Sequence, residues 1–335
     1  MKKIKNIQKK GKRKGNRNTI LLAILLFIFT LPLYAVEEYG GSVSLGASYD
    51  SNPGADLESS GQKSRSLKNI GDFSMDFSSD LFIYPVKNLY LDYFTALTYT
   101  FQNEGYSFFL HAADIAYEGE FSSFDLNTGL QFGHIVYDFN EAFNRIEAEP
   151  YLEIVHYQSD ALSGWYRLSF QYRKPFYFYD IYYEGFKIAA DIGELVTFMN
   201  GKSSFLLNSV ICAYILENST EIYDTATVDK KNSYLSFSQN IRLKLGFGIF
   251  SMTPGFEYEL LYFFANDEWN DLSKKRTDHS ISPFLKLILR PKEFISLNLS
   301  YKYLKNFSTL GEESTDYTDL NYDRHRVFFE ISGFF

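Results

Sequence analysis

The most constraining feature of this sequence is an alternation of apolar and polar residues that recurs along most of its length. In residues 71–83 the odd positions include Phe73, Met75, Phe77, Leu81 and Ile83, and the even positions include Asp72, Ser74, Asp76, Ser78 and Asp80. Successive side chains of a strand point to opposite faces, whereas a helix would spread both sets around its surface. The segment is therefore predicted to be a strand with one apolar and one polar face.

The same pattern recurs throughout the chain. Strands are predicted near 39–50, 69–84, 89–101, 107–121, 124–137, 143–157, 165–174, 184–198, 203–216, 233–248, 250–264, 279–290, 294–305 and 322–335. The fold class is therefore all-β, a transmembrane antiparallel up-and-down β-barrel of about 14 strands, and a number of roughly 12–16 strands is compatible with the pattern. Three prolines fall inside predicted strands, where their missing N–H predicts β-bulges: Pro150, Pro254 and Pro283.

Hydropathy separates a membrane barrel from a bundle of membrane helices. The mean hydropathy is −0.21, although the chain contains 33 Phe and 27 Tyr. Beyond residue 35, no stretch has the roughly 18 consecutive apolar residues that indicate a membrane helix. Barrel strands alternate lipid-facing and lumen-facing residues and so average to neutral hydropathy, and their closure pairs every backbone group. The aromatic residues are expected to form girdles at the two membrane interfaces.

The predicted connections alternate between long and short. The long ones include 51–68, 175–183, 217–232, 265–278 and 306–321, whereas residues 122–123 and 199–202 make short turns. Outer-membrane barrels have long loops on the cell surface and short turns in the periplasm. The alternation therefore predicts that both ends of the barrel lie on the periplasmic side.

The first 35 residues read as a secretory signal peptide. Residues 1–18 carry nine Lys or Arg and no acid, and an apolar run from Ile20 to Leu33 leads to Ala35. This is the order of a basic region, a hydrophobic region and a small exit residue. We expect cleavage near Ala35, with an uncleaved anchor as the alternative. The domains are then 1–35, the signal peptide, and 36–335, the barrel, whose net charge is −17 because −8 for the whole chain less +9 leaves −17.

The last strand carries a resemblance to a known signal. One of its faces reads Val327, Phe329, Ile331, Gly333 and Phe335, and the chain ends on Phe335. This resembles the C-terminal assembly signal of Gram-negative outer-membrane proteins, which the barrel-assembly machinery reads. The resemblance implies insertion into the outer membrane of a Gram-negative-type bacterium.

A second resemblance lies at the end of the first predicted strand. Residues 49–53 read Tyr-Asp-Ser-Asn-Pro and resemble the opening strand of β-barrel porin families. The same residues also suit a turn, because Asn and Pro favour turn conformations. Neither resemblance carries a substrate or a catalytic residue.

The alternation assigns charges to the lumen. The predicted pore-lining acidic wall comprises Asp72, Asp76, Asp80, Asp92, Asp114, Glu118, Glu147, Glu149 and Glu153. The predicted pore-lining basic wall comprises Arg167, Arg173, Lys187, Arg242, Lys244, Lys286, Lys302 and Arg326. Charged walls set ion preference in channels, so we expect a transverse field and a modest preference for cations; the alternative is ordinary solvated charges with local pairing.

Other chemistry finds little support in the sequence. It contains no Walker A motif, no HExxH motif and no Cys/His zinc spacing, and Cys212 is its only cysteine. The alternation places His111, His134 and His156 on the lipid-facing side, an unsuitable place for a general base. We therefore expect no enzyme activity, no metal and no cofactor. A strongly acidic chain also makes nucleic acid an unsuitable partner.

The expected function is a porin-like pore for small hydrophilic solutes. The expected partners are outer-membrane lipid, the barrel-assembly machinery and those solutes. One alternative is the barrel component of a polysaccharide or surface-protein export system. Another is a structural or adhesive barrel with a closed lumen.

Overall fold

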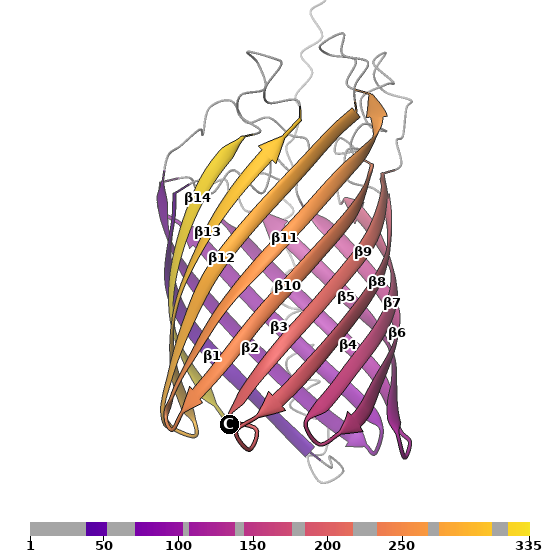
Figure 1. Ribbon diagram of the computed structural model, residues 1–335, viewed down its shortest axis with the longest axis vertical. Coiled ribbons are helices and arrows are strands. Elements are labelled where there is room, and N and C mark those ends of the chain that lie inside the picture. The colour runs from indigo at the N-terminus through magenta and orange to yellow at the C-terminus, as the bar shows by residue number, and fades with distance from the viewer. Residues whose placement is uncertain are drawn as a thin grey trace, which may run out of the picture.

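The protein is a closed antiparallel barrel of fourteen strands (Figure 1). The structure, a computed structural model, describes residues 38–51, 71–102, 107–137, 144–175, 185–216, 233–266, 275–309 and 321–335. The strands are β1 (Glu38–Asp50), β2 (Asp72–Val86), β3 (Leu89–Thr100), β4 (Phe108–Glu120), β5 (Phe124–Tyr137), β6 (Arg145–Ser159), β7 (Leu162–Pro175), β8 (Gly185–Phe198), β9 (Ser203–Leu216), β10 (Tyr234–Phe247), β11 (Phe250–Asn266), β12 (Lys275–Lys292), β13 (Ile295–Ser308) and β14 (Tyr322–Phe334).

Each strand pairs with its neighbours in sequence, and β1 closes the barrel by pairing with β14. The seam continues to the last residue, because Gly41 and Phe335 exchange two backbone hydrogen bonds, each with an N–O distance of 3.1 Å. Closure leaves no strand with an open edge, which is the requirement for a sheet in hydrocarbon. The predicted fold class and strand number are confirmed.

The strand ends differ from the prediction mainly on the side of the long connections. β12 begins at Lys275, inside the predicted loop 265–278, and β13 continues to Ser308, inside the predicted loop 306–321. Polar residues such as Thr277 and Asn306 still pair in these extensions. Alternating hydropathy marks only the part of a strand that has an apolar side, so it does not detect such extensions.

The expected bulges at the prolines are wrong. Pairing between β6 and β7 resumes in the same register on both sides of Pro150, and β11 keeps its register with β12 through Pro254 and Pro283. The register shifts lie instead near strand ends, as between Ile83 and Val86. A proline removes one N–H donor, and here this interrupts the ladder locally without inserting a residue.

Short turns gather at one end of the barrel, where the C-terminus also lies (Figure 1). The turn between β10 and β11 consists of Gly248 and Ile249, between the paired residues Phe247 and Phe250. Gly248 has a φ of +62°, which suits the first central position of a tight hairpin turn. Within the described part of the chain, no helix has the length and apolarity needed to cross a membrane. The predicted signal peptide, 1–35, and most residues of the predicted long loops lie outside the described residues.

Candidate functional site on the inner wall

The inner face of the barrel is identified by contacts that reach across an intervening strand. Lys302 of β13 forms an ion pair with Glu257 of β11, and Tyr151 of β6 donates a hydrogen bond to Asp114 of β4 at 3.1 Å. Only side chains on the concave face of a closed sheet converge in this way. The opposite face carries large exposed apolar side chains, such as Leu168, which is 57% exposed.

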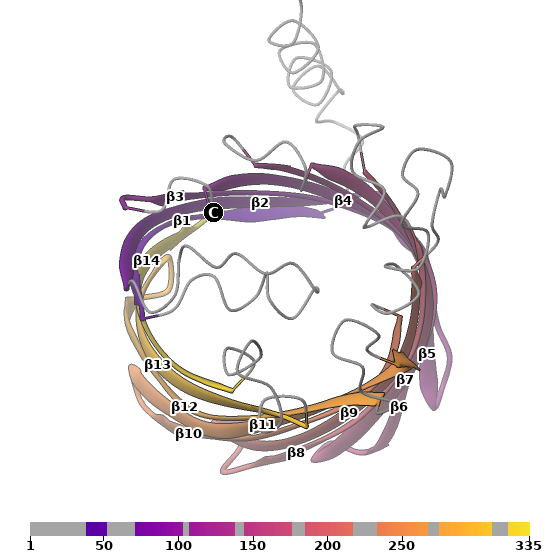
Figure 2. The ribbon, with the colours of Figure 1, turned by 90° about the horizontal axis from the view of Figure 1, so that it is seen from above.

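The strand registers place all the predicted pore-lining residues on this inner face. Asp92 pairs with Asp114 and Asp114 with Gln131, and Glu147 pairs with Arg173. Residues directly opposite each other in neighbouring strands share a face. Strands β2–β4, which carry six of the nine predicted acids, and strands β10–β13, which carry four of the eight predicted bases, lie on different sides of the barrel (Figure 2).

Five acids on β2–β4 form what we call the acidic strip: Asp76, Asp80, Asp92, Asp114 and Glu118. Two of them accept hydrogen bonds from neutral hydroxyls: Thr98 donates to Asp76 at 2.7 Å and Tyr84 donates to Glu118 at 3.1 Å. One buried oxygen each of Asp80 and Asp92 has no hydrogen-bond partner. Among the described residues, no Lys or Arg forms an ion pair with the strip.

Asp72 is on the inner face but is not part of this strip. Its side chain is 2% exposed, and its carboxylate accepts hydrogen bonds from the backbone N–H of Gln102 at 3.0 and 3.2 Å. The residue therefore connects the end of β2 to the residues after β3. The alternation in the sequence predicts that Asp72 faces the lumen, but it does not show that its carboxylate is buried.

Two of the three predicted acids on β6 are paired with arginines. Glu147 forms ion pairs with Arg145 at 2.7 Å and Arg173 at 2.8 Å, and Glu149 lies 3.7 Å from Arg167. Glu153 accepts a hydrogen bond from Asn127 at 3.0 Å. The predicted acidic and basic walls therefore meet in ion pairs at the β6–β7 boundary, whereas Glu153, like the acids on β2–β4, has no ion pair with a base of the described residues.

The basic side is partly neutralised. Arg242 and Lys302 share Glu257, and Arg326 lies 3.9 Å from Asp50. The described residues place no carboxylate in ion-pair contact with three other predicted bases, Lys187, Lys244 and Lys286.

Aromatic residues on the inner face were not anticipated. The guanidinium of Arg167 lies 4.0 Å from the ring centroid of Tyr151, and that of Arg173 lies 5.2 Å from the centroid of Tyr214. Tyr214 is 5% exposed and packs against Tyr234 in a tilted arrangement, with ring centroids 5.4 Å apart. The expectation that aromatics form interfacial girdles misses these residues. The alternation within β9 and β10 places Tyr214 and Tyr234 at inward-facing positions, so the sequence could have predicted them, although residues 205–216 are apolar on both faces.

All five histidines lie on the outer face, as their pairing with outward residues shows: His111 pairs with His134, which pairs with the exposed Ile146. Asp278 and His279 are consecutive in β12 and point to opposite faces, so they cannot act as an acid–base pair. Within the described residues, no group of three or more His, Cys, Asp or Glu side chains could hold a metal ion.

Comparison with solved structures bears on the fold of the chain. No protein-family model matches the chain, and no curated protein matches its sequence. Among solved structures, the outer membrane channel DcaP of Acinetobacter baumannii superimposes with a TM-score of 0.50 at 11% identity, over 89% of this chain and 96% of that chain. The loop L8 deletion mutant of OmpT, an outer membrane protein of Vibrio cholerae, gives a TM-score of 0.49 at 8% identity, over 90% of this chain and 100% of that chain. The anion-selective porin from Comamonas acidovorans gives 0.44 at 10% identity, over 89% and 99%. At such identities, the likeness to DcaP shows a shared fold.

Proposed function

We propose that this protein is an outer-membrane pore for small hydrophilic solutes, with a modest preference for cations. The observation that carries the proposal is the acidic strip, a set of inward-facing carboxylates that no described base neutralises. A polar inner wall beneath an apolar outer surface is the arrangement of a barrel that holds water in its lumen.

The dimensions of a fourteen-strand barrel support a conducting lumen. Strands about 4.8 Å apart and tilted by about 40° give a circumference of roughly 88 Å and a backbone diameter of about 28 Å. Side chains reduce the bore to roughly 10–15 Å. Eight strands leave an interior that side chains fill, and fourteen leave more room.

Delivery to the outer membrane belongs to the same proposal. The basic and apolar residues up to Ala35 would direct export, and the terminal strand ending on Phe335 would be read by the barrel-assembly machinery. The pore would act without enzymatic chemistry, since its histidines face away from the lumen and the described inner wall offers no paired acid and histidine. A barrel for export, or a closed structural barrel, remains the alternative reading.

The proposal is tested by current measurements in planar bilayers under a salt gradient. The wild type should conduct, with a reversal potential on the cation side that moves toward zero at about 1 M salt, where the screening length falls to about 3 Å. The triple variant Asp80→Asn, Asp92→Asn, Asp114→Asn should shift the reversal potential toward anions, because it replaces three carboxyl groups of the strip with neutral amides of the same shape.

The matched control is Glu194→Gln, which removes an exposed carboxylate from the outer face of β8. It should leave the reversal potential unchanged. An anion-selective wild type, or a triple variant that behaves like the control, would refute the cation preference. Absence of conductance would instead favour the closed barrel.

A further inference from the structure

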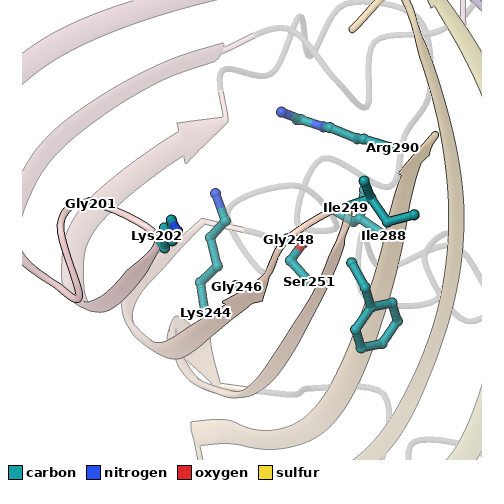
Figure 3. A pocket seen from close by; sticks show the side chains of 10 residues that line it. Gly201, Lys202, Lys244, Gly246, Gly248, Ile249, Ser251, Ile288 and Arg290 are labelled. Atoms are coloured by element: carbon teal, nitrogen blue, oxygen red, sulfur yellow. The ribbon is translucent and has the colours of Figure 1, made fainter. Parts of the chain in front are cut away.

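A cavity at the turn end of the barrel has a lining unlike the rest of the inner wall. Its volume is about 180 Å³, and it lies between the β8–β9 turn, the β10–β11 turn and the end of β12. The charged residues that line it are Lys202, Lys244 and Arg290, and no acid lines it (Figure 3). A cavity of this volume is large enough for several water molecules, or for one small ion together with the first atoms of the group attached to it.

The backbone builds this cavity by bringing two hairpins close together. The N–H of Arg290 donates to the carbonyl oxygen of Ile249 at 2.7 Å, which fixes the end of β12 against the β10–β11 turn. On the other side, an added Cβ on Gly246 would lie 2.3 Å from the carbonyl oxygen of Lys202. Only glycine at position 246 therefore permits this approach of the β8–β9 turn, which carries the Lys202 side chain to the cavity.

The positive charge of this cavity is uncompensated within the described part of the chain. No carboxylate there forms an ion pair with any of its three bases, in contrast to Arg242 and Lys302 nearby, which share Glu257. Lys286 adds a fourth base on the same face, opposite Thr253 of β11. Three cations around one cavity with no acid in its lining repel one another, and a bound anion relieves that repulsion.

The side chains also indicate which anion fits. Arg290 offers a planar set of donors suited to two oxygens of a phosphate or carboxylate, and the two lysines add point charges. Ser251 supplies a hydroxyl donor and Ile288 an apolar surface in the same lining. Three cations balance a dianion better than a monoanion, which favours phosphate over carboxylate.

We propose that this cavity binds the phosphate group of a small phosphorylated solute at the turn end of the barrel. The site does not depend on the lumen being open. It would give the otherwise cation-preferring inner wall one binding site for an anionic solute, formed by residues of β10, β12 and the β8–β9 turn.

The test uses the full-length barrel refolded in detergent and titrated calorimetrically with inorganic phosphate. The wild type should bind phosphate, and more weakly as chloride concentration rises. The double variant Lys244→Gln, Arg290→Gln should bind at least about tenfold more weakly, because each substitution removes charge-assisted hydrogen bonds. Heat-modifiable migration on gels verifies that the variants are folded.

The matched control is Lys292→Gln, which removes an exposed base two residues from Arg290 and outside the cavity lining. It should bind phosphate like the wild type. No binding by the wild type, or equal losses in the control and the double variant, would overturn the proposal. Phosphate binding without bilayer conductance would leave this site standing and refute the open pore, and conductance without binding would do the reverse.

Discussion

At the scale of single residues, the contact that most affects the barrel seam is the ion pair between Asp50 of β1 and Arg324 of β14. Arg324 Nε lies 2.9 and 3.0 Å from the two carboxylate oxygens, and both residues are at most 8% exposed. Removing the carboxylate of this buried pair weakens its charge-assisted hydrogen bonds, at a cost of about 1.5–3 kcal/mol. Asp50→Asn should therefore lower the free energy of unfolding by about that amount, measured by urea denaturation.

An exposed pair between β14 and its other neighbour, β13, provides the control. Lys305 Nζ lies 3.7 Å from Asp323, and their side chains are 41% and 53% exposed. Exposed pairs contribute about 0–1 kcal/mol, so Lys305→Met should change the unfolding free energy by no more than that. Similar losses in the two variants would mean that burial does not control the strength of the seam pair.

At the scale of elements, β14 both closes the barrel and carries the residues that resemble an assembly signal. The ring of Phe335 is 67% exposed, while its backbone holds the seam through Gly41. Because Phe335→Ala keeps the backbone bonds, it should slow outer-membrane insertion several-fold only if the ring itself is recognised. Pulse-chase analysis of heat-modifiable migration measures this.

The neighbouring residue distinguishes recognition from general damage. Phe334→Ala removes a ring of the same size whose position pairs with Ser42, on the opposite face of β14 from Phe335. This variant should insert at the wild-type rate. Normal insertion of Phe335→Ala, or equal slowing of both variants, would remove the case for a terminal signal.

At the scale of the whole molecule, the two ends of the barrel are predicted to face different compartments. In a Cys212→Ser background, cysteines at Ser60 and Ser314, positions outside the described residues, should react with a membrane-impermeant maleimide in intact cells, because long loops face the surface. Cysteines at Lys87 and Asn200, in the short turns, should react only after the outer membrane is permeabilised. The reverse pattern would mean that the barrel is inverted.

The sequence alone determined the architecture and the facing of most charges. Period-two alternation is a local property of the chain, so residues such as Phe73 and Asp76 reveal their faces without any knowledge of partners. The same alternation defined fourteen strands to within a few residues, except where β12 and β13 extend beyond the apolar band. Which residues of a strand face the lumen and which face the lipid does not depend on which strand lies beside it.

Only the tertiary structure decided which charges act together. Lys302 reaches Glu257 across β12, and Asp50 meets Arg324 after 274 residues of chain, because closure and register bring these positions into contact. The same geometry buries Asp72, neutralises Glu147 with two arginines and leaves the acidic strip without bases. It also gathers Lys202, Lys244 and Arg290 around one cavity. Local hydropathy contains no information on these distances, because they depend on the inter-strand register and on the curvature of the closed sheet.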